Sequence, residues 1–156
     1  MKLSKKALIL TLTLTLILSC ALSGCGKDFS KRTVTRFDEE FRWDMSVSEA
    51  AAYIKNHQEE SAEITVREYP DFTVVTDGNY TFRFNNQGRL ALAKLNLGTG
   101  DDALDLAVSW YGKWDNHEKG TTTFDRYEWY ANMAGRNVTI TLYQPGAEFY
   151  LEYTPE

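Results

Sequence analysis

The 156-residue sequence is poor in cysteine, histidine and proline, and these shortages exclude several classes of protein. It has two cysteines, Cys20 and Cys25, together with two histidines and three prolines. Both cysteines lie at the end of the most apolar segment, and none follows. The chain beyond them therefore has no disulfide framework, no thiol nucleophile and no cysteine metal site. A domain of this kind depends on its apolar core alone.

The N-terminus has the layout of a bacterial export signal. Lys2, Lys5 and Lys6 precede an apolar run over 7–18, and small residues follow that run. The run is shorter than the roughly 20 residues that span a bilayer core. A permanent transmembrane helix is therefore not expected here.

The motif LSGC at 22–25 resembles the lipobox of bacterial lipoproteins. The resemblance implies a signal peptide over 1–24, cleavage before Cys25 and a diacylglycerol on its sulfur. Two or three acyl chains, at about 0.8 kcal/mol per buried methylene, anchor a protein firmly. An ordinary secretory signal is the alternative, and a second lipobox ending at Cys20 fits less well. We expect a lipid-anchored protein outside the cytoplasm, on the outer face of a single cell membrane or facing a periplasm.

Removal of the signal leaves an acidic domain. Three lysines and no acids leave with it, so the net charge changes from −5 to −8. Nucleic acids and anionic lipid headgroups require basic patches, so neither is an expected ligand of the domain. Residues 25–36 are predicted to be the lipidated N-terminus and a polar tether, and 37–156 a single domain.

Capping patterns and alternation predict two helices, each followed by strands. Ser46 and Glu49 have capping-box spacing before a first apolar helix face, and Thr99 and Asp102 repeat that spacing before a second. Gly112 is the predicted end of the second helix. The predicted strands are 63–69, 71–76, 79–85 and 89–97 in the first half, and 121–131, 136–143 and 147–154 in the second.

The order of elements is similar in the two halves. We therefore expect an α+β fold of two tandem α-β-β-β units, about 43–97 and 99–154, which form one antiparallel sheet with the helices packed on one face. Any α+β domain of this length shows some likeness between its halves, which is the alternative interpretation.

The same pattern resembles the tandem helix-plus-meander domains of small bacterial lipoproteins. These are the β-lactamase-inhibitor-protein-like fold and the related small lipoprotein of the outer-membrane β-barrel assembly machinery. The resemblance covers most of 37–154 and implies either a protein-binding module or an envelope protein of uncharacterised function. The inhibitor proteins carry disulfides, which this domain cannot form, so inhibitor function is not implied. The stretches that carry the resemblance are 41–54, 80–95, 106–116, 127–130 and 138–143.

No catalytic or metal-binding motif is assembled in the sequence. His57 is typical of a helix cap, and Asp115, His117 and Glu118 are too few to form a metal site without further ligands. The serines lack a Gly-x-Ser-x-Gly elbow, and 98–102 is typical of a helix entry rather than a phosphate loop. We expect no cofactor and no enzyme, although a glycosidase would need only two acids far apart in sequence.

Aromatic side chains are the remaining candidate site residues. Trp129 and Tyr130 are adjacent on one predicted strand, so one of them faces away from the core. Most aromatic rings are expected to fill the helix–sheet interface, while rings on an exposed face could bind a protein or stack on sugars. The predicted exposed face or edge carries Tyr127, Trp129, Tyr143 and Tyr150, and Tyr130, Trp110 and Trp114 complete the candidate binding residues.

The sequence thus predicts a membrane-anchored, non-enzymatic interaction module that binds another protein of the cell envelope. The alternative is a lipoprotein that binds cell-wall glycan or another small molecule between helices and sheet. A contiguous exposed aromatic patch would favour the first function, and a closed, polar-lined pocket would favour the second.

Overall fold

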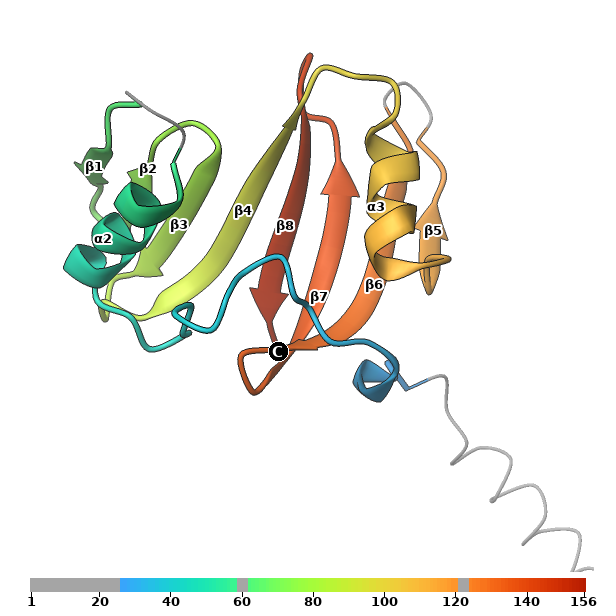
Figure 1. Cartoon of the computed structure of the whole chain (residues 1–156), viewed down its shortest axis with the longest axis horizontal. Helices are drawn as coiled ribbons and strands as arrows, with labels where there is room; N and C mark the ends of the chain where they lie inside the picture. Colours follow the sequence, from blue (N-terminus) through green and yellow to red (C-terminus); the bar gives the residue numbers. More distant parts are fainter. Residues whose placement is uncertain (1–25, 59–61, 121–123) are drawn as a thin grey trace, which may run out of the picture.

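The computed structural model describes residues 26–58, 62–120 and 124–156. Within these residues, two α-helices and an eight-stranded antiparallel sheet form an α+β fold (Figure 1). The strand order is β1-β2-β3-β4-β8-β7-β6-β5. The elements are η1 (Phe29–Lys31), α2 (Val47–His57), β1 (Thr65–Glu68), β2 (Phe72–Thr76), β3 (Tyr80–Asn85), β4 (Leu90–Gly98), α3 (Ala103–Tyr111), β5 (Asn116–Glu118), β6 (Arg126–Met133), β7 (Arg136–Tyr143) and β8 (Phe149–Pro155).

Helix α2 begins at the predicted capping box. The Ser46 amide donates to the Glu49 carboxylate at 2.8 Å, and the Glu49 amide donates to the Ser46 hydroxyl at 3.3 Å. These two bonds satisfy amide groups that lack a partner within the helix. The buried side of α2 carries Ala50, Tyr53 and Ile54.

Helix α3 begins later than its predicted capping box. It starts at Ala103, and its preceding residue Asp102 makes no side-chain cap bond. The predicted box at Thr99 and Asp102 is therefore wrong, since Thr99 lies well before the first helical turn. The predicted end at Gly112 is confirmed, and its φ of 73° explains why glycine stands there.

Each α-helix is followed by four strands, one more than in the predicted α-β-β-β unit. In the first half, the four separate strand ranges predicted from the sequence all form, so there the error lies in the three-stranded unit and not in the strands. In the second half the structure adds β5, which is short, fully exposed and polar, so that no apolar alternation marks it. Of the strand predicted over 121–131, residues 121–123 lie outside the described residues, and β6 begins at Arg126.

One side of the sheet, here called the core face, is buried except at the edge strands β1 and β5. Tyr53 of α2 contacts it at Phe82, with ring centroids 5.8 Å apart. Tyr111 of α3 contacts it at Trp129, with centroids 6.1 Å apart. Directly opposed residues share one side of a sheet, and the central row of the core face is Val75, Phe82, Ala93, Tyr153, Ile140 and Trp129, each 0% exposed.

The opposite side of the sheet, here called the outer face, is mainly polar, although Phe72 and Leu92 also lie on it. Its side chains alternate along each strand with those of the core face. Charges of both signs stand next to threonines along it, and Arg83, Arg126 and Thr154 are exposed. Its central row consists of Thr76, Thr81, Lys94, Glu152, Thr141 and Glu128.

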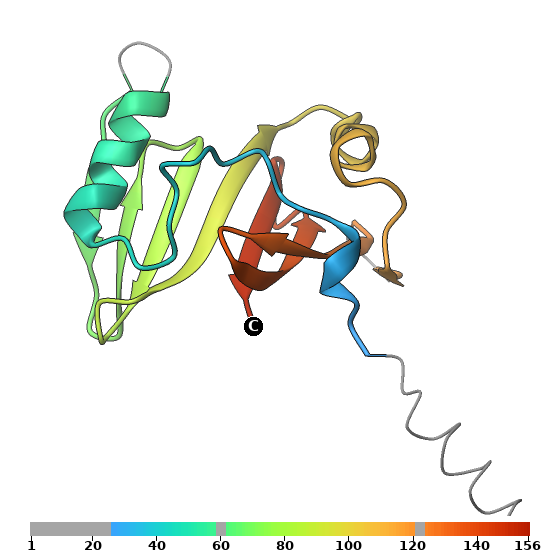
Figure 2. The ribbon, with the colours of Figure 1, turned by 60° about the horizontal axis from the view of Figure 1, so that its bottom comes forward.

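The segment before α2, residues 26–46, is here called the N-terminal segment. It passes around the edge of the sheet, from the outer face to the core face (Figure 2). Phe29 packs on Tyr130 of the outer face, and the Val34 amide donates to the carbonyl of Asn132 at the β6 edge. Phe37, Phe41 and Trp43 are then buried. Over the described part of the predicted tether, the chain therefore contacts the domain closely.

Candidate functional site

Strand alternation divides the predicted aromatic site residues between the two sheet faces. Trp129 is 0% exposed, and its indole nitrogen donates to the Gly112 carbonyl at 2.8 Å. Tyr127, two residues away, is buried on the same side. The prediction that these two rings lie on an exposed face is wrong, because the core face needs large side chains at alternate positions of β6. Tyr130 faces the other way.

The remaining tryptophans close the α3 end of the core. Trp110 on α3 is half-buried, and the Arg36 guanidinium lies 4.2 Å from its ring centroid. Trp114, just after α3, packs on Tyr127 with centroids 4.8 Å apart. Neither ring lies on the outer face, so the predicted binding set does not form one continuous surface.

Tyr143 and Tyr150 do lie together on the outer face. They are opposed on β7 and β8, half-buried, with ring centroids 6.0 Å apart. The Lys94 ammonium lies 4.1 Å from the Tyr150 ring centroid, and the Tyr143 hydroxyl donates to Glu152 at 3.3 Å. We call Tyr143, Tyr150, Lys94 and Glu152 the tyrosine patch.

Burial shapes the chemistry of the tyrosine patch. Desolvation, together with the nearby Glu152 carboxylate, raises the pKa of Tyr143 to about 12. The pKa of Tyr150 is raised mainly by its hydrogen bond to Glu148. Both hydroxyls therefore stay protonated at neutral pH. Beside the patch is a hollow of about 280 Å³, lined by Arg126, Thr141, Tyr143 and Glu152.

Tyr130, the third candidate on the outer face, is covered by the segment before α2. The Phe29 ring lies 5.5 Å from it, and the Lys27 ammonium lies 5.4 Å from its centroid. Lys27 also forms an ion pair with Glu156 at 2.6 Å. Tyr130 thus holds the N-terminal segment and is not free to bind a partner as the tyrosine patch is.

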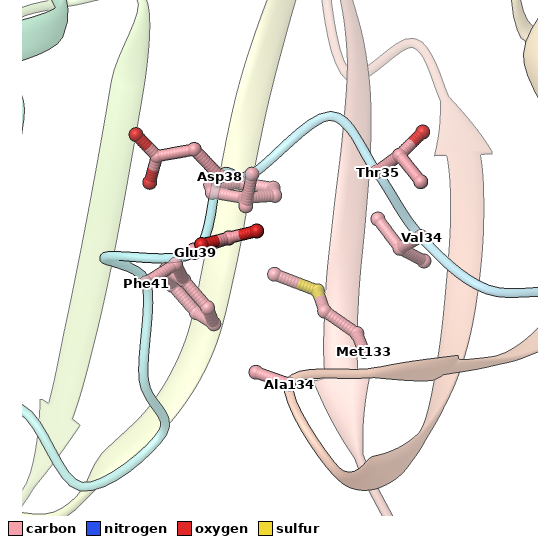
Figure 3. A pocket seen from close by; sticks show the side chains of 8 residues that line it. Val34, Thr35, Asp38, Glu39, Phe41, Met133 and Ala134 are labelled. Carbon is pink, nitrogen blue, oxygen red and sulfur yellow. The ribbon is translucent and has the colours of Figure 1, made fainter.

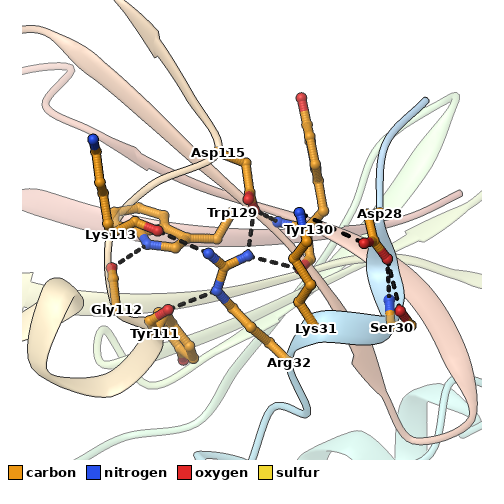
Figure 4. A network of polar contacts seen from close by, with 10 residues as sticks. All are labelled: Asp28, Ser30, Lys31, Arg32, Tyr111, Gly112, Lys113, Asp115, Trp129 and Tyr130. Atoms are coloured by element: carbon orange, nitrogen blue, oxygen red, sulfur yellow. Dashed lines mark hydrogen bonds and ion pairs between the residues drawn. The ribbon is translucent and has the colours of Figure 1, made fainter. Parts of the chain in front are cut away.

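Arg32 ties the N-terminal segment to α3 and β6 (Figure 4). It donates to the carbonyl of Tyr111, the last residue of α3, at 2.6 Å, and to the carbonyl of Lys113, just beyond the helix, at 2.7 Å. It also pairs with Asp115, which accepts the Tyr130 amide at 2.8 Å. Arginine suits this place because its guanidinium offers five donors in one plane. The sequence gives no sign of this role, because Arg32 lies in a polar stretch without pattern.

A cavity of about 410 Å³ lies between the N-terminal segment and the β6–β7 turn (Figure 3). Its apolar part comes from the core, and its charged part from two carboxylates of the N-terminal segment. Sequence reasoning missed this cavity, because its walls lie about 95 residues apart in the chain. The lining residues are Val34, Thr35, Phe37, Asp38, Glu39, Phe41, Met133 and Ala134.

Each histidine pairs with a carboxylate. His57 caps the end of α2 by a 2.8 Å contact with the Tyr53 carbonyl, and its other nitrogen lies 2.5 Å from Asp38. His117 lies 2.8 Å from Asp125. Among the residues that the structure describes, no group of three or more His, Cys, Asp and Glu side chains could hold a metal ion. Asp115 is occupied by Arg32 instead.

The predicted signal peptide over 1–24 and the lipidation residue Cys25 lie outside the described residues. In the described ranges, no helix is both long and apolar enough to cross a membrane. Comparisons of the chain with protein-family models, with curated proteins and with solved structures found no match.

Proposed function

We propose that this chain is a lipid-anchored protein outside the cytoplasm, whose domain binds another protein of the cell envelope and catalyses no reaction. The observation that carries the proposal is the pair Tyr143 and Tyr150, side by side and half-buried on the outer face. Tyrosine is enriched in protein interfaces because it offers a large apolar ring and a hydroxyl that can form hydrogen bonds.

The surroundings of the pair support a protein partner. Lys94, Glu152 and Arg126 bring both signs of charge next to the rings. Such an arrangement selects a partner by charge complementarity and keeps an unbound surface soluble. The strand edges are less suitable, since β1 and β5 are short and each carries a charged residue, which disfavours strand addition.

We further propose that the two halves are tandem units with both helices on the core face. Two observations support this arrangement. The strand order runs inward from β1 and from β5 to a central β4–β8 pair, so the halves mirror one another. Tyr53 and Tyr111 contact the same register row, and Figure 2 draws α2 and α3 on the same side of the sheet. This packing leaves the outer face available to a partner.

A lipid on Cys25 would hold the domain close to the bilayer. Only Gly26 separates Cys25 from Lys27, whose ammonium pairs with Glu156. A chain extends at most about 3.6 Å per residue, so the anchor would lie within about 7 Å of Lys27 along the chain. The partner is therefore expected to be a membrane protein or another membrane-bound protein.

The proposal is tested by mild crosslinking of the tagged, full-length protein in its own membranes, followed by purification and mass spectrometry. The Tyr143→Ala/Tyr150→Ala variant removes the patch, and Tyr69→Ala removes an exposed tyrosine outside it. We expect one stoichiometric partner with the wild type and with Tyr69→Ala, and its loss with the patch variant. Cys25→Ala should release the protein from the membrane fraction.

Two outcomes would contradict this proposal. Recovery of the same partner with the patch variant would show that another surface binds it. Recovery of the wild type alone and monomeric would exclude the interaction module and favour the second candidate function, which is binding of glycan or a small molecule. The observation behind this second candidate is the cavity beneath the N-terminal segment, which is open and mainly apolar rather than closed and polar-lined, and so favours a small molecule with an apolar part over a glycan.

A further inference from the structure

The cavity between the N-terminal segment and the β6–β7 turn has an apolar floor. The floor is formed by Phe37, Phe41 and Met133. Each of these side chains is at most 5% exposed, so the floor belongs to the core. In Figure 3 the Met133 side chain points from its strand toward Phe41, across the middle of the cavity. The volume of about 410 Å³ lies within the roughly 300–1,000 Å³ typical of small-ligand sites.

The charged lining of the cavity has one sign. Asp38 and Glu39 are its charged lining residues, and the Asp38 carboxylate is already paired with His57 at 2.5 Å. Glu39 makes no hydrogen bond or ion pair with the part of the chain that the structure describes. Figure 3 shows its carboxylate above the space between Phe41 and Met133. Glu39 is an exposed residue, so the attraction of its carboxylate for a cation is that of a surface ion pair.

We propose that this cavity binds a small organic amine, with its apolar body on Phe37, Phe41 and Met133 and its ammonium group on Glu39. The apolar body is recognised by the floor, and charge complementarity selects the ammonium group over a hydroxyl or a carboxylate. The cavity belongs to the core-face side, so this site is separate from the tyrosine patch. The proposal deepens the second candidate function, small-molecule binding, and its test is independent of the crosslinking test of the tyrosine patch.

Three probes of similar shape and different charge test the proposal. They are 2-phenylethylamine, 2-phenylethanol and phenylacetate, titrated into the full-length protein in neutral detergent micelles by calorimetry, with protein-free micelles as the blank. We expect the amine to bind roughly two- to five-fold more tightly than the alcohol, which is the range of a partly exposed ion pair. Phenylacetate should bind most weakly.

Variants locate the binding. Glu39→Gln should reduce the affinity for the amine to that for the alcohol and leave the alcohol unchanged. Glu40→Gln is the matched control, because Glu40 is adjacent and exposed but does not line the cavity. Thr35→Phe, which fills the cavity from its exposed rim, should weaken binding of the amine and of the alcohol alike.

Several results would overturn the proposal. These are equal affinity for all three probes, no binding of the amine at millimolar concentration, or equal effects of Glu39→Gln and Glu40→Gln. Far-ultraviolet circular dichroism of each variant verifies that a loss of binding is not a loss of fold.

Discussion

The hydroxyl groups of Tyr111 on α3 and Tyr153 on β8 lie 2.8 Å apart in the buried interior. This contact links the last residue of α3 to β8, the strand at the middle of the sheet, where Tyr153 stands in the central row of the core face. Burial raises the pKa of Tyr111 to about 12, and burial raises the pKa of Tyr153 well above its usual value. Both groups are therefore neutral, and each is the other's hydrogen-bond partner.

A double-mutant cycle should show that the pair is coupled. Tyr111→Phe or Tyr153→Phe alone leaves one buried hydroxyl without its partner, so each should lower the free energy of unfolding by about 1–2 kcal/mol. The double variant should be no less stable than either single variant, because no orphaned hydroxyl remains. Urea unfolding followed by circular dichroism measures this. Additive losses would contradict the coupling.

The β6–β7 turn contains a residue that is unfavourable for its conformation. Ala134 has a φ of 48°, and Gly135 follows with a φ of 77°. Two-residue hairpins of this kind favour Asn-Gly, because a side chain with a Cβ other than Asn or Asp is strained there. Ala134→Asn should raise the free energy of unfolding by about 0.5–1 kcal/mol. This is measured by urea unfolding.

The matched control for this turn is Ala147→Asn. Ala147 is exposed and lies outside the positive-φ region. Asparagine there relieves no backbone strain, so it should not raise the free energy of unfolding. An Ala134→Asn protein that is less stable than the wild type would contradict the strain.

Local signals in the sequence predicted the elements that depend on local chemistry. The Ser46 and Glu49 capping box and the end of α3 at Gly112 both form at the expected residues. They form because a short hydrogen bond or a positive φ at one residue decides each of them. The α+β class and the antiparallel sheet follow from the same signals.

Features that depend on distant contacts were not predictable. Thr99 and Asp102 have the spacing of a capping box, but the contacts of Ala103 with the core set the start of α3. β5 is polar and is recognised by its pairing with β6 alone. The cavity and the Arg32 contacts join segments that are far apart in the chain, and one sequence gives no record of such pairs.

Stability should depend on pH through His57 and Asp38. Burial lowers the pKa of His57, but the Tyr53 carbonyl and the Asp38 carboxylate outweigh it, so the net pKa is above its usual 6.5. Burial raises the pKa of Asp38, but His57 and the Glu40 amide outweigh this, so it falls below its usual 3.8. The pair therefore makes its full contribution to the free energy of unfolding between about pH 3.8 and 6.5.

This contribution should be lost as pH rises through the raised pKa of His57, and as pH falls through the lowered pKa of Asp38. Since both side chains are partly exposed, its size is about 0.5 kcal/mol. The difference in unfolding free energy between wild type and His57→Gln, measured from pH 4 to 9, should shrink above the pKa of His57. His117→Gln keeps the pair and is the control. A difference that grows with pH would contradict this sign.

Arg32 should hold the N-terminal segment on the domain more strongly than its charge alone can. Arg32→Lys keeps the charge but loses the planar fork that reaches the Tyr111 and Lys113 carbonyls, so it should cost about 2 kcal/mol of unfolding free energy. Hydrogen exchange of the Val34 amide, which donates to Asn132 at the β6 edge, should become faster. Arg42→Lys is the control, because that side chain is 55% exposed and its pairing with Glu49 should matter by less than about 0.5 kcal/mol. Equal effects of the two substitutions would show that the segment is held by its apolar residues and not by Arg32.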